Sequence, residues 1–436
     1  MTKQIVIIGN GIAGISAARH IRKLSNHPIT VISAESKYFF SRTALMYVFM
    51  GHMKMEHTQP YENFFWQKNK IDLLQKFVTH VDRKSKCVVF DDGAKLSYDA
   101  LIIASGSVPN KYGWPGENLN GVQGLYSLQD LQLLEKNAPT AKRAVIVGGG
   151  LIGIEAAEML RSRNIEVTFL VREKLFWNNV LPQQESQMIS NHIKQHHVDL
   201  RLQTELQEIC DDGNGNVNAI VTKGGERINC EIVLLTAGVR PNIDYIRSSD
   251  IATNKGILVN DYLQTNMEDI YAIGDCAEVA NPCDGRRKIE PVWYTGKLMG
   301  EVVAHTICGE PMKYNPGIWF NSAKFFDIEY QTYGSVPSIL PDNMDWFYWQ
   351  HPTQNKSVRI SFDKNTKAVL GFNYLGLRAR HQVCDEWIKS KTKIDDVVNN
   401  LSMANFDPEF SRKHESEIRE AFANSEKQLS QTPHAI

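Results

Sequence analysis

Residues 5–14 read IVIIGNGIAG, four apolar residues that run directly into a Gly-x-Gly-x-x-Gly loop. A helix-compatible stretch follows from Ile15 to Leu24, so the loop joins a buried strand to a helix. In this context Gly9 allows a tight turn, Gly11 lets a pyrophosphate approach the backbone, and Gly14 lets the helix pack closely on the strand. The stretch therefore predicts an α/β domain that binds a dinucleotide.

An acidic residue stands where such a domain holds a ribose. A second strand is expected from Ile29 to Ser33, and Glu35 lies just beyond it, 21 residues after Gly14. A carboxylate at this place can accept hydrogen bonds from a ribose diol. The alternative, a glycine turn in an unrelated α/β domain, is disfavoured by the strand, the spacing and the acid together.

The same pattern recurs at residues 144–153, which read AVIVGGGLIG and precede a helical run through Arg161. Two such loops about 140 residues apart predict two dinucleotides in one chain. We expect the second loop to contact the second dinucleotide through Gly148, Gly150, Leu151, Ile152 and Gly153.

The residues after the next strand bear on the choice of nicotinamide cofactor. Glu173 follows Gly153 by 20 residues and matches the ribose acid of the first unit. The flanking Arg172 and Lys174 could instead pair with a 2'-phosphate. NADH is therefore slightly favoured, and NADPH stays open.

Composition excludes several other classes of protein. The chain has 436 residues, of which 42% are hydrophobic and 22% charged, as in soluble multidomain proteins. A net charge of -1 argues against nucleic-acid binding, and no apolar stretch approaches the roughly 20 residues that span a bilayer. Seven scattered cysteines without a CxxC pair suggest neither a disulfide framework nor a zinc site. We expect a cytoplasmic protein without a metal.

Three further motifs make the sequence resemble the FAD-dependent pyridine nucleotide oxidoreductase family, whose members carry two dinucleotide-binding domains. Residues 101–109 (LIIASGSVP) resemble its ATG crossover segment, with Ser105 in place of the usual Thr. Residues 234–242 (LLTAGVRPN) resemble the partner segment, and residues 265–277, which include IYAIGD, resemble the second FAD signature. The resemblance implies FAD contacts at Ala104, Ser105, Gly106, Gly274 and Asp275, the last through the ribityl chain, and an NAD(P)H contact at Gly238.

The segment FSRTAL at residues 40–45 resembles the branch that contains ferredoxin and rubredoxin reductases, nitrite reductase flavin domains and apoptosis-inducing factor. The resemblance makes Arg42 a flavin contact. Where the disulfide reductases carry a redox-active cysteine pair this segment has none, and the single cysteine of NADH peroxidases and oxidases is missing too. A thiolate accepts electrons from the flavin in those enzymes, so disulfide reduction by that route should be unavailable.

Two more residues match the family near the reacting rings. Glu155 matches a glutamate of the family that lies near the bound nicotinamide. Trp293, in a segment that resembles the flavin-proximal one, could cover the ring edge, although core packing is an equal alternative.

The resemblance implies an α/β fold of two Rossmann-like domains, similar to glutathione reductase, with a C-terminal α+β interface domain. The expected domains are an FAD domain (1–113 and 247–315), an NAD(P)H domain (114–246) and the interface domain (316–436). From about residue 316 the composition becomes aromatic and strand-like, which indicates a mixed sheet with helices near 378–400. Interface domains of the family often mediate dimerisation or acceptor docking, so the sequence leaves open whether the chain forms a homodimer.

These features together favour an oxidoreductase that passes electrons from NADH or NADPH through FAD to an acceptor. The acceptor stays open among a small electron-transfer protein, a quinone, a metal centre and oxygen. Two alternatives remain: a redox-responsive binding protein similar to apoptosis-inducing factor, and the flavin subunit of a larger complex.

Overall fold

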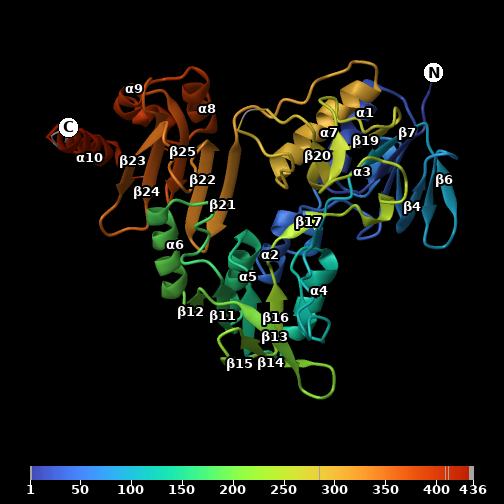
Figure 1. Cartoon of the computed structure of the whole chain (residues 1–436). Coiled ribbons are helices and arrows are strands. Elements are labelled where there is room, and N and C mark those ends of the chain that lie inside the picture. The colour runs from blue at the N-terminus through green and yellow to red at the C-terminus, as the bar shows by residue number, and fades with distance from the viewer. Residues whose placement is uncertain (1, 284, 408, 411, 432–436) are drawn as a thin grey trace. The chain divides into compact units, whose positions relative to one another are not determined.

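The computed structural model describes residues 2–283, 285–407, 409–410 and 412–431, which divide into two compact units (Figure 1). The first unit comprises the described residues within 1–148, 159–166 and 206–316, and the second comprises those within 149–158, 167–205 and 317–436. Each unit is described by itself. Among the described residues, every helix is too short or too polar to span a lipid bilayer. All seven cysteines are unpaired.

A five-stranded parallel sheet forms the centre of the first unit. Its strand order is β19-β7-β1-β2-β3, with β19 at Ile270–Ala272, β7 at Ala100–Ile103, β1 at Ile5–Ile8, β2 at Ile29–Ser33 and β3 at Ile71–Gln75. Every residue of β1 is buried, because the strand has neighbours on both sides and helices pack on the sheet. The apolar run at residues 5–8 is therefore a buried strand, as predicted, and it lies at the centre of the sheet.

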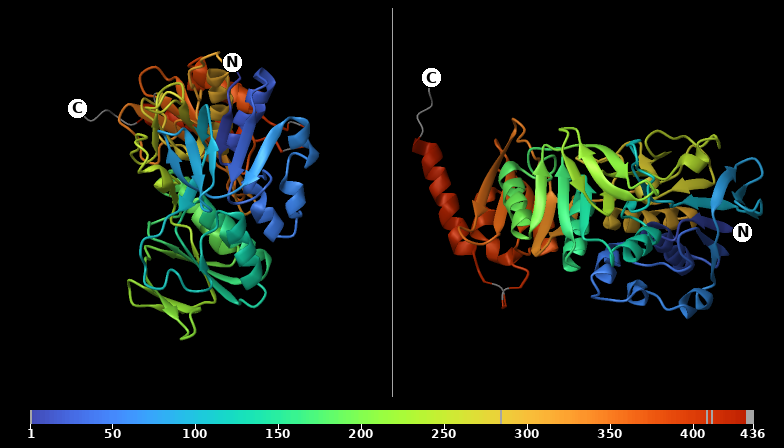
Figure 2. Two further views of the ribbon diagram at one scale, coloured as in Figure 1. Left: turned by 90° about the vertical axis from the view of Figure 1, so that its right-hand side faces the viewer. Right: turned by 90° about the horizontal axis from the view of Figure 1, so that it is seen from below.

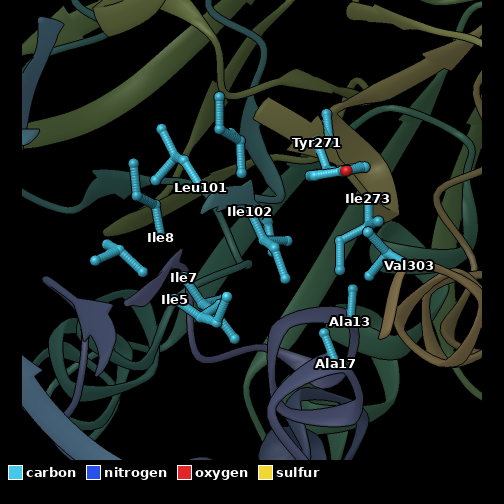
Figure 3. Packing of buried hydrophobic residues seen from close by; sticks show 14 of the residues in the cluster. Ile5, Ile7, Ile8, Ala13, Ala17, Leu101, Ile102, Tyr271, Ile273 and Val303 are labelled. Carbon is cyan, nitrogen blue, oxygen red and sulfur yellow. The ribbon is translucent and has the colours of Figure 1, made fainter. Parts of the chain in front are cut away.

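Two helices cover this sheet, α1 (Ile12–Leu24) and α7 (Trp293–Ile307). They approach each other closely because Gly300 has no side chain: a Cβ atom there would lie 2.5 Å from the carbonyl oxygen of Ala13. Figure 3 shows Ala13 of α1 and Val303 of α7 beside Ile273, the residue that follows β19, in this core.

Smaller elements complete the first unit. An antiparallel sheet of β4 (Val78–Asp82), β5 (Cys87–Phe90) and β6 (Lys95–Ser97) is drawn in light blue in Figure 2. A second parallel group joins β9 (Val122–Gln123), β16 (Ile232–Leu235) and β10 (Arg143–Val147). The remaining elements are α2 (Leu45–Phe49), α3 (Phe64–Lys68), α4 (Leu128–Asn137), β8 (Ser107–Pro109), β13 (Leu206–Asp211), β14 (Val217–Thr222), β15 (Arg227–Asn229), β17 (Val239–Pro241), β18 (Ile257–Val259), β20 (Ala277–Val279) and the 3-10 turns η1 (Arg42–Ala44), η2 (Met55–Thr58), η3 (Asp244–Ile246) and η4 (Gly274–Cys276).

The second unit is built on an antiparallel sheet in the order β21-β22-β25-β24-β23. Its strands are β21 (Phe320–Phe325), β22 (Ile328–Gly334), β25 (Val369–Leu375), β24 (Ser357–Asp363) and β23 (Met344–Gln350). The expectation of a mixed sheet was wrong, because every neighbouring pair is antiparallel. Short connections such as the two residues between β21 and β22 can join only antiparallel neighbours.

The aromatic residues of this sheet are mainly core. Tyr333, Phe347, Trp349 and Phe372 are all buried in one cluster with residues of the helices. The helices of the unit are α6 (Gln183–Gln195), α8 (His381–Lys389), α9 (Ile394–Asn399), η5 (Leu401–Ala404) and α10 (Glu415–Gln431). The parallel strands β11 (Glu166–Val171) and β12 (Val198–Leu202) pair through residues 167–171 and 198–202, and α5 (Leu151–Ser162) contributes residues 151–158.

A fully buried ion pair joins α6 to the antiparallel sheet. The guanidinium of Arg359 on β24 donates two hydrogen bonds to the carboxylate of Glu185 on α6, at 2.7 and 2.8 Å. Neither side chain has any solvent exposure. The guanidinium also lies 4.3 Å from the ring centre of Trp346 and 4.5 Å from that of Tyr348, so aromatic faces replace water around the charge.

We expect replacement of Glu185 by alanine to lower the free energy of unfolding by about 3–5 kcal/mol, because Arg359 would stay buried without a counter-charge. Urea unfolding followed by tryptophan fluorescence measures this loss. The control is Gln187→Ala, an exposed position on the same helix, which should change stability by less than about 0.5 kcal/mol. The double variant Glu185→Leu/Arg359→Met should recover most of the lost stability, because it removes both charges. A Glu185→Ala protein as stable as the control would show that Glu185 does not compensate the buried charge of Arg359.

Candidate cofactor-binding sites

The first glycine loop is shaped by two backbone contacts that exclude side chains. Gly9 has a φ of +110°, and a Cβ atom there would lie 2.1 Å from the carbonyl oxygen of Ala104. A Cβ atom on Gly14 would lie 2.0 Å from the carbonyl oxygen of Gly9. Both distances are far below van der Waals contact, so only glycine lets β1, α1 and β7 meet in this way.

Gly11 differs from these two glycines, because no atom lies within 4 Å of its ideal Cβ position. It caps α1 in an extended conformation, its residue type offers no side-chain cap, and the first turn of α1 contains no acidic residue. The first N–H groups of the helix are thus left without a side-chain partner. This combination of open space and helix N-terminus fits a pyrophosphate, which is the group that the sequence predicts there.

Glu35 and Arg42 form a bidentate ion pair at the end of β2. The guanidinium nitrogens of Arg42 donate to the two carboxylate oxygens of Glu35 at 2.9 and 2.6 Å. One of these oxygens also accepts the backbone N–H of Leu128 at 2.8 Å, and Arg42 donates to the carbonyl oxygen of Tyr126 at 2.6 Å. A carboxylate offers about four acceptor positions, so Glu35 retains one for a ribose hydroxyl.

Asp275 lies in a partly buried polar cluster with Ser107 and Tyr126. Ser107 donates its hydroxyl hydrogen to a carboxylate oxygen of Asp275 at 3.0 Å, and its backbone N–H donates to the Tyr126 hydroxyl at 3.1 Å. Burial raises the pKa of Asp275, an effect that the Ser107 hydrogen bond and the Arg42 charge oppose. Burial likewise raises the pKa of Tyr126 to about 12, so this phenol keeps its hydrogen at neutral pH.

The two crossover segments pair with each other in the first unit. Strand β17 runs antiparallel to β8, with Arg240 opposite Val108. The hydroxyl of Ser105 donates to the carbonyl oxygen of Asn242 at 2.7 Å, and the backbone N–H of Asn242 donates to the carbonyl oxygen of Gly106 at 2.9 Å. Gly238, at a φ of +90°, accepts the backbone N–H of Asn110. Ser105 therefore ties the two segments together.

Gly274 lies near the N-terminal half of α1, and Trp293 lies at the start of α7. Gly274 has a φ of +72°, and a Cβ atom there would lie 3.0 Å from the side chain of Ala13. Trp293 is the first residue of α7 and is 37% exposed, with its ring packed edge-on against Tyr294 at 5.5 Å. A partly exposed indole is available to a ligand, which core packing would not allow.

The second loop repeats the contrast between crowded and open glycines. In the first unit, Gly148 has a φ of +119°, and a Cβ atom there would lie 2.7 Å from the Cα atom of Ala237. In the second unit, Gly150 has open space at its Cβ position and precedes α5, whose first turn begins with Leu151 and Ile152 and has no acidic residue. Gly153 is buried in the same turn. The features of Gly150 again fit a phosphate group.

The residues that could choose between NADH and NADPH form a pair. Arg172 donates through Nε to a carboxylate oxygen of Glu173 at 2.8 Å. The Glu173 side chain is 24% exposed and that of Arg172 is 76% exposed. The carboxylate is thus the more enclosed of the two charges, which favours the ribose-binding interpretation of this position.

Glu155 on α5 is half-buried in the second unit beside another carboxylate. Burial and the charge of Glu158 raise the pKa of Glu155 to about 7, and the ammonium group of Lys324 opposes the rise. Lys324 itself pairs with Glu158 at 2.7 Å. Glu155 therefore changes charge near neutral pH.

Residues 3–299 match the family model described as pyridine nucleotide-disulphide oxidoreductase. The chain belongs to this family. Its members are FAD- and NAD(P)H-dependent oxidoreductases, so the family predicted from the motifs is confirmed. The fold class of two Rossmann-like domains with a C-terminal α+β domain is confirmed by the solved structures of relatives.

Two curated relatives and one solved structure illustrate the range of the family. The assimilatory nitrate reductase electron transfer subunit of Bacillus subtilis is 30% identical over 73% of this chain, which spans only 41% of that subunit. The NADH-rubredoxin oxidoreductase of Clostridium acetobutylicum is 26% identical over 91% of this chain and 99% of its own length. The NAD-dependent persulfide reductase from A. fulgidus is 25% identical, with a TM-score of 0.84 over 98% of this chain and 84% of that one.

Sequence reasoning missed the partners that surround the predicted flavin residues. Ser107 contacts Asp275, and Tyr126 contacts Ser107. Leu128 donates its backbone N–H to Glu35. Ser107 stands within the crossover motif, so its place two residues after Ser105 was an available signal. No local pattern marks Tyr126, which reaches the cluster from a loop.

We expect Gly11→Ala and Gly14→Ala to fail in different ways. The Cβ atom of Gly11→Ala meets no protein atom, so the flavin-free protein should keep its thermal stability while FAD affinity falls, because the methyl group occupies the space for a pyrophosphate. Gly14→Ala should destabilise the flavin-free protein itself, because its Cβ atom meets the Gly9 carbonyl.

Thermal denaturation of flavin-free protein and titration with FAD separate the two effects. A Gly11→Ala protein that binds FAD as tightly as wild type would show that no phosphate approaches this glycine.

Proposed function

We propose that the chain transfers a hydride from NADH or NADPH to FAD and passes the electrons directly to a small electron-carrier protein. One observation carries this proposal: Thr43 and its neighbours in residues 35–60 include no cysteine, although this stretch holds the predicted flavin contact Arg42. Without a thiol at that position the electrons have to leave the flavin itself. The relative named NADH-rubredoxin oxidoreductase, matched over 99% of its length, supports a carrier protein as acceptor.

The proposed FAD site uses the polar groups of the first unit. Gly9, Gly11 and Gly14 bring the start of α1 to the pyrophosphate, and Glu35 accepts hydrogen bonds from the adenosine ribose. Arg42 is the proposed flavin contact and also holds Glu35 in place. Further contacts are proposed at Ala104, Ser105, Gly106, Gly274, Asp275 and Trp293.

The proposed nicotinamide-cofactor residues are Gly148, Gly150, Leu151, Ile152, Gly153, Arg172, Glu173 and Gly238, with Glu155 near the nicotinamide ring. FAD, when bound, accepts the hydride and releases the electrons. The residues of the chain bind and orient both cofactors, and no protein acid or base is required for the hydride step.

The proposed division into an FAD domain (1–113 and 247–315), an NAD(P)H domain (114–246) and an interface domain (316–436) follows the order of the motifs. A cytoplasmic location is supported by the seven unpaired cysteines, since oxidising compartments favour disulfides. Homodimerisation through residues 316–436 is proposed on the position of that domain alone.

The proposed donor and acceptor are tested by anaerobic titration of the flavin-loaded protein with NADH and NADPH, followed by addition of oxidised rubredoxin or a plant-type ferredoxin. We expect NADH to bleach the flavin absorbance and the carrier to restore it at a rate that saturates with carrier concentration. Glu173→Ala should weaken the binding of NADH, because the ribose loses its hydrogen-bond acceptor. Arg172→Ala should leave the affinity for NADH unchanged.

Other outcomes would exclude the proposal. If neither nicotinamide bleaches the flavin, hydride transfer is wrong. If the flavin is reduced but neither carrier reoxidises it, the acceptor is wrong, and NADH-dependent association of the protein would favour a redox-responsive binding role.

We expect the affinity of the oxidised protein for NAD⁺ to rise as the pH increases through about 7. Ionised Glu155 would stabilise the positive nicotinamide ring, and a change of up to about tenfold corresponds to a one-unit shift of its pKa on binding. Calorimetric titration with NAD⁺ at several pH values measures this. Glu155→Gln should abolish the rise, and Glu158→Gln should move it to lower pH, because loss of the neighbouring negative charge lowers the pKa of Glu155. A rise that persists in Glu155→Gln would assign it to another group.

A further inference from the structure

Two histidines and an aspartate meet at one point of the second unit, among residues that have no part in the proposed cofactor sites. His192 lies on α6 and His196 follows its last residue, so the two share one face of the helix at a spacing of four. Asp327 lies in the two-residue turn between β21 and β22 (α6 and β21 in Figure 1). All three belong to the second unit.

The three side chains direct their ligand atoms at one another. The Nε2 atoms of His192 and His196 are 3.2 Å apart. One carboxylate oxygen of Asp327 lies 2.6 Å from Nε2 of His192 and 3.0 Å from Nε2 of His196. Three potential donor atoms of an N,N,O set thus lie within 3.2 Å of each other.

These separations match those around a small divalent ion. Bonds of about 2.0–2.1 Å in a tetrahedral zinc site hold ligand atoms roughly 3.3 Å apart. The two nitrogens already have nearly this spacing, and the Asp327 oxygen, now 2.6 Å from Nε2 of His192, would need to withdraw by roughly 0.7 Å to reach it. The Asp327 side chain is 74% exposed, so rotation about its bonds meets little resistance.

Hydrogen bonding alone satisfies this arrangement poorly. Hydrogens on both Nε2 atoms would have to share one carboxylate oxygen and lie close together, whereas an unprotonated Nε2 would face its neighbour with a lone pair. A single cation accepts electron pairs from all three atoms at once.

Two further residues hold the histidines in position. Nδ1 of His192 is 3.0 Å from the side-chain amide of Asn355, the kind of contact that orients a metal-bound imidazole. With a metal at Nε2, Nδ1 carries the hydrogen, and Asn355 accepts it after its amide rotates to present oxygen. The ring of Phe326 stacks on that of His196 at 4.2 Å and 6°. Phe326 takes a φ of +57°, a costly conformation for a bulky residue, in the turn that carries Asp327.

A second group, His351, His414 and Glu417, gives a useful contrast. Nδ1 of His351 already accepts the backbone N–H groups of Thr353 and Gln354, at 3.2 and 3.1 Å. Nε2 of His414 faces the ammonium group of Lys356 at 3.3 Å. Nδ1 of His414 in turn lies 3.3 Å from a carboxylate oxygen of Glu417, so hydrogen bonds already account for the contacts of this group.

We propose that His192, His196 and Asp327 bind a divalent transition-metal ion of the zinc type, with water completing its coordination. Imidazole and carboxylate ligands suit zinc and its neighbours in the first transition series. The ion would clamp α6 to the β21–β22 turn. Because His196 and Asp327 are both partly exposed, the ion can enter from solvent.

Zinc binding to the chelator-treated, flavin-loaded full chain, purified without a histidine tag, tests the site by isothermal titration calorimetry. We expect one zinc ion per chain and a rise in melting temperature when zinc is added. His196→Ala and Asp327→Asn should each weaken zinc binding by more than about tenfold and abolish the rise in melting temperature, and Asn355→Ala should weaken binding by about tenfold.

His197→Asn is the matched control, because His197 is exposed, adjacent in sequence and outside the cluster, and asparagine tolerates its φ of +58°. It should bind zinc as wild type does. His196→Ala and Asp327→Asn change partly exposed side chains, so both should stay folded, which their flavin spectrum and metal-free melting temperature verify. Equal zinc affinity in wild type and Asp327→Asn, or no zinc binding by wild type, would overturn the proposal.

Discussion

The contact of three backbone segments around Gly9 is the constraint on which the first unit depends. Gly14 of α1 packs against the carbonyl group of Gly9, and Gly9 packs against the carbonyl group of Ala104, which follows β7. The strand, the helix and the crossover segment therefore meet without side chains between them. This closeness aims the start of α1 at the open space beside Gly11. Gly300 repeats the device where α7 meets α1. Backbone packing alone thus shapes the proposed phosphate site.

Charge is arranged differently at the two ends of the proposed FAD site. At the end of β2, Glu35 and Arg42 neutralise each other in a partly exposed pair. Around Asp275 the carboxylate has neutral partners, Ser107 and Tyr126, and burial raises its pKa. A carboxylate held by neutral donors keeps more acceptor strength for a ligand hydroxyl than one bound to a guanidinium.

The elements set by local patterns were predictable from sequence, and those set by distant pairing were not. The glycine loops and the strand at residues 5–8 follow from turn and packing rules that act within a few residues. Strand β22, with the mixed sequence IEYQTYG, was missed, because its polar residues weaken the local apolar signal and its place in the sheet depends on pairing with β21 and β25. The His192–His196 spacing was visible in the sequence, but Asp327 lies 131 residues from His196, and only the fold joins them. The Arg359–Glu185 pair spans 174 residues and has the same cause.

That ion pair also bears on how the chain could be recombined with its relatives. Glu185 lies in the region assigned from sequence to the NAD(P)H domain, and Arg359 lies in the C-terminal sheet, yet each is the only charge neutralising the other in the described part of this core. A chimera that exchanges residues from 316 onward with a relative would leave one charge stranded unless α6 travels with the sheet. The helix and the sheet therefore have to be exchanged together, although more than a hundred residues separate them in the sequence.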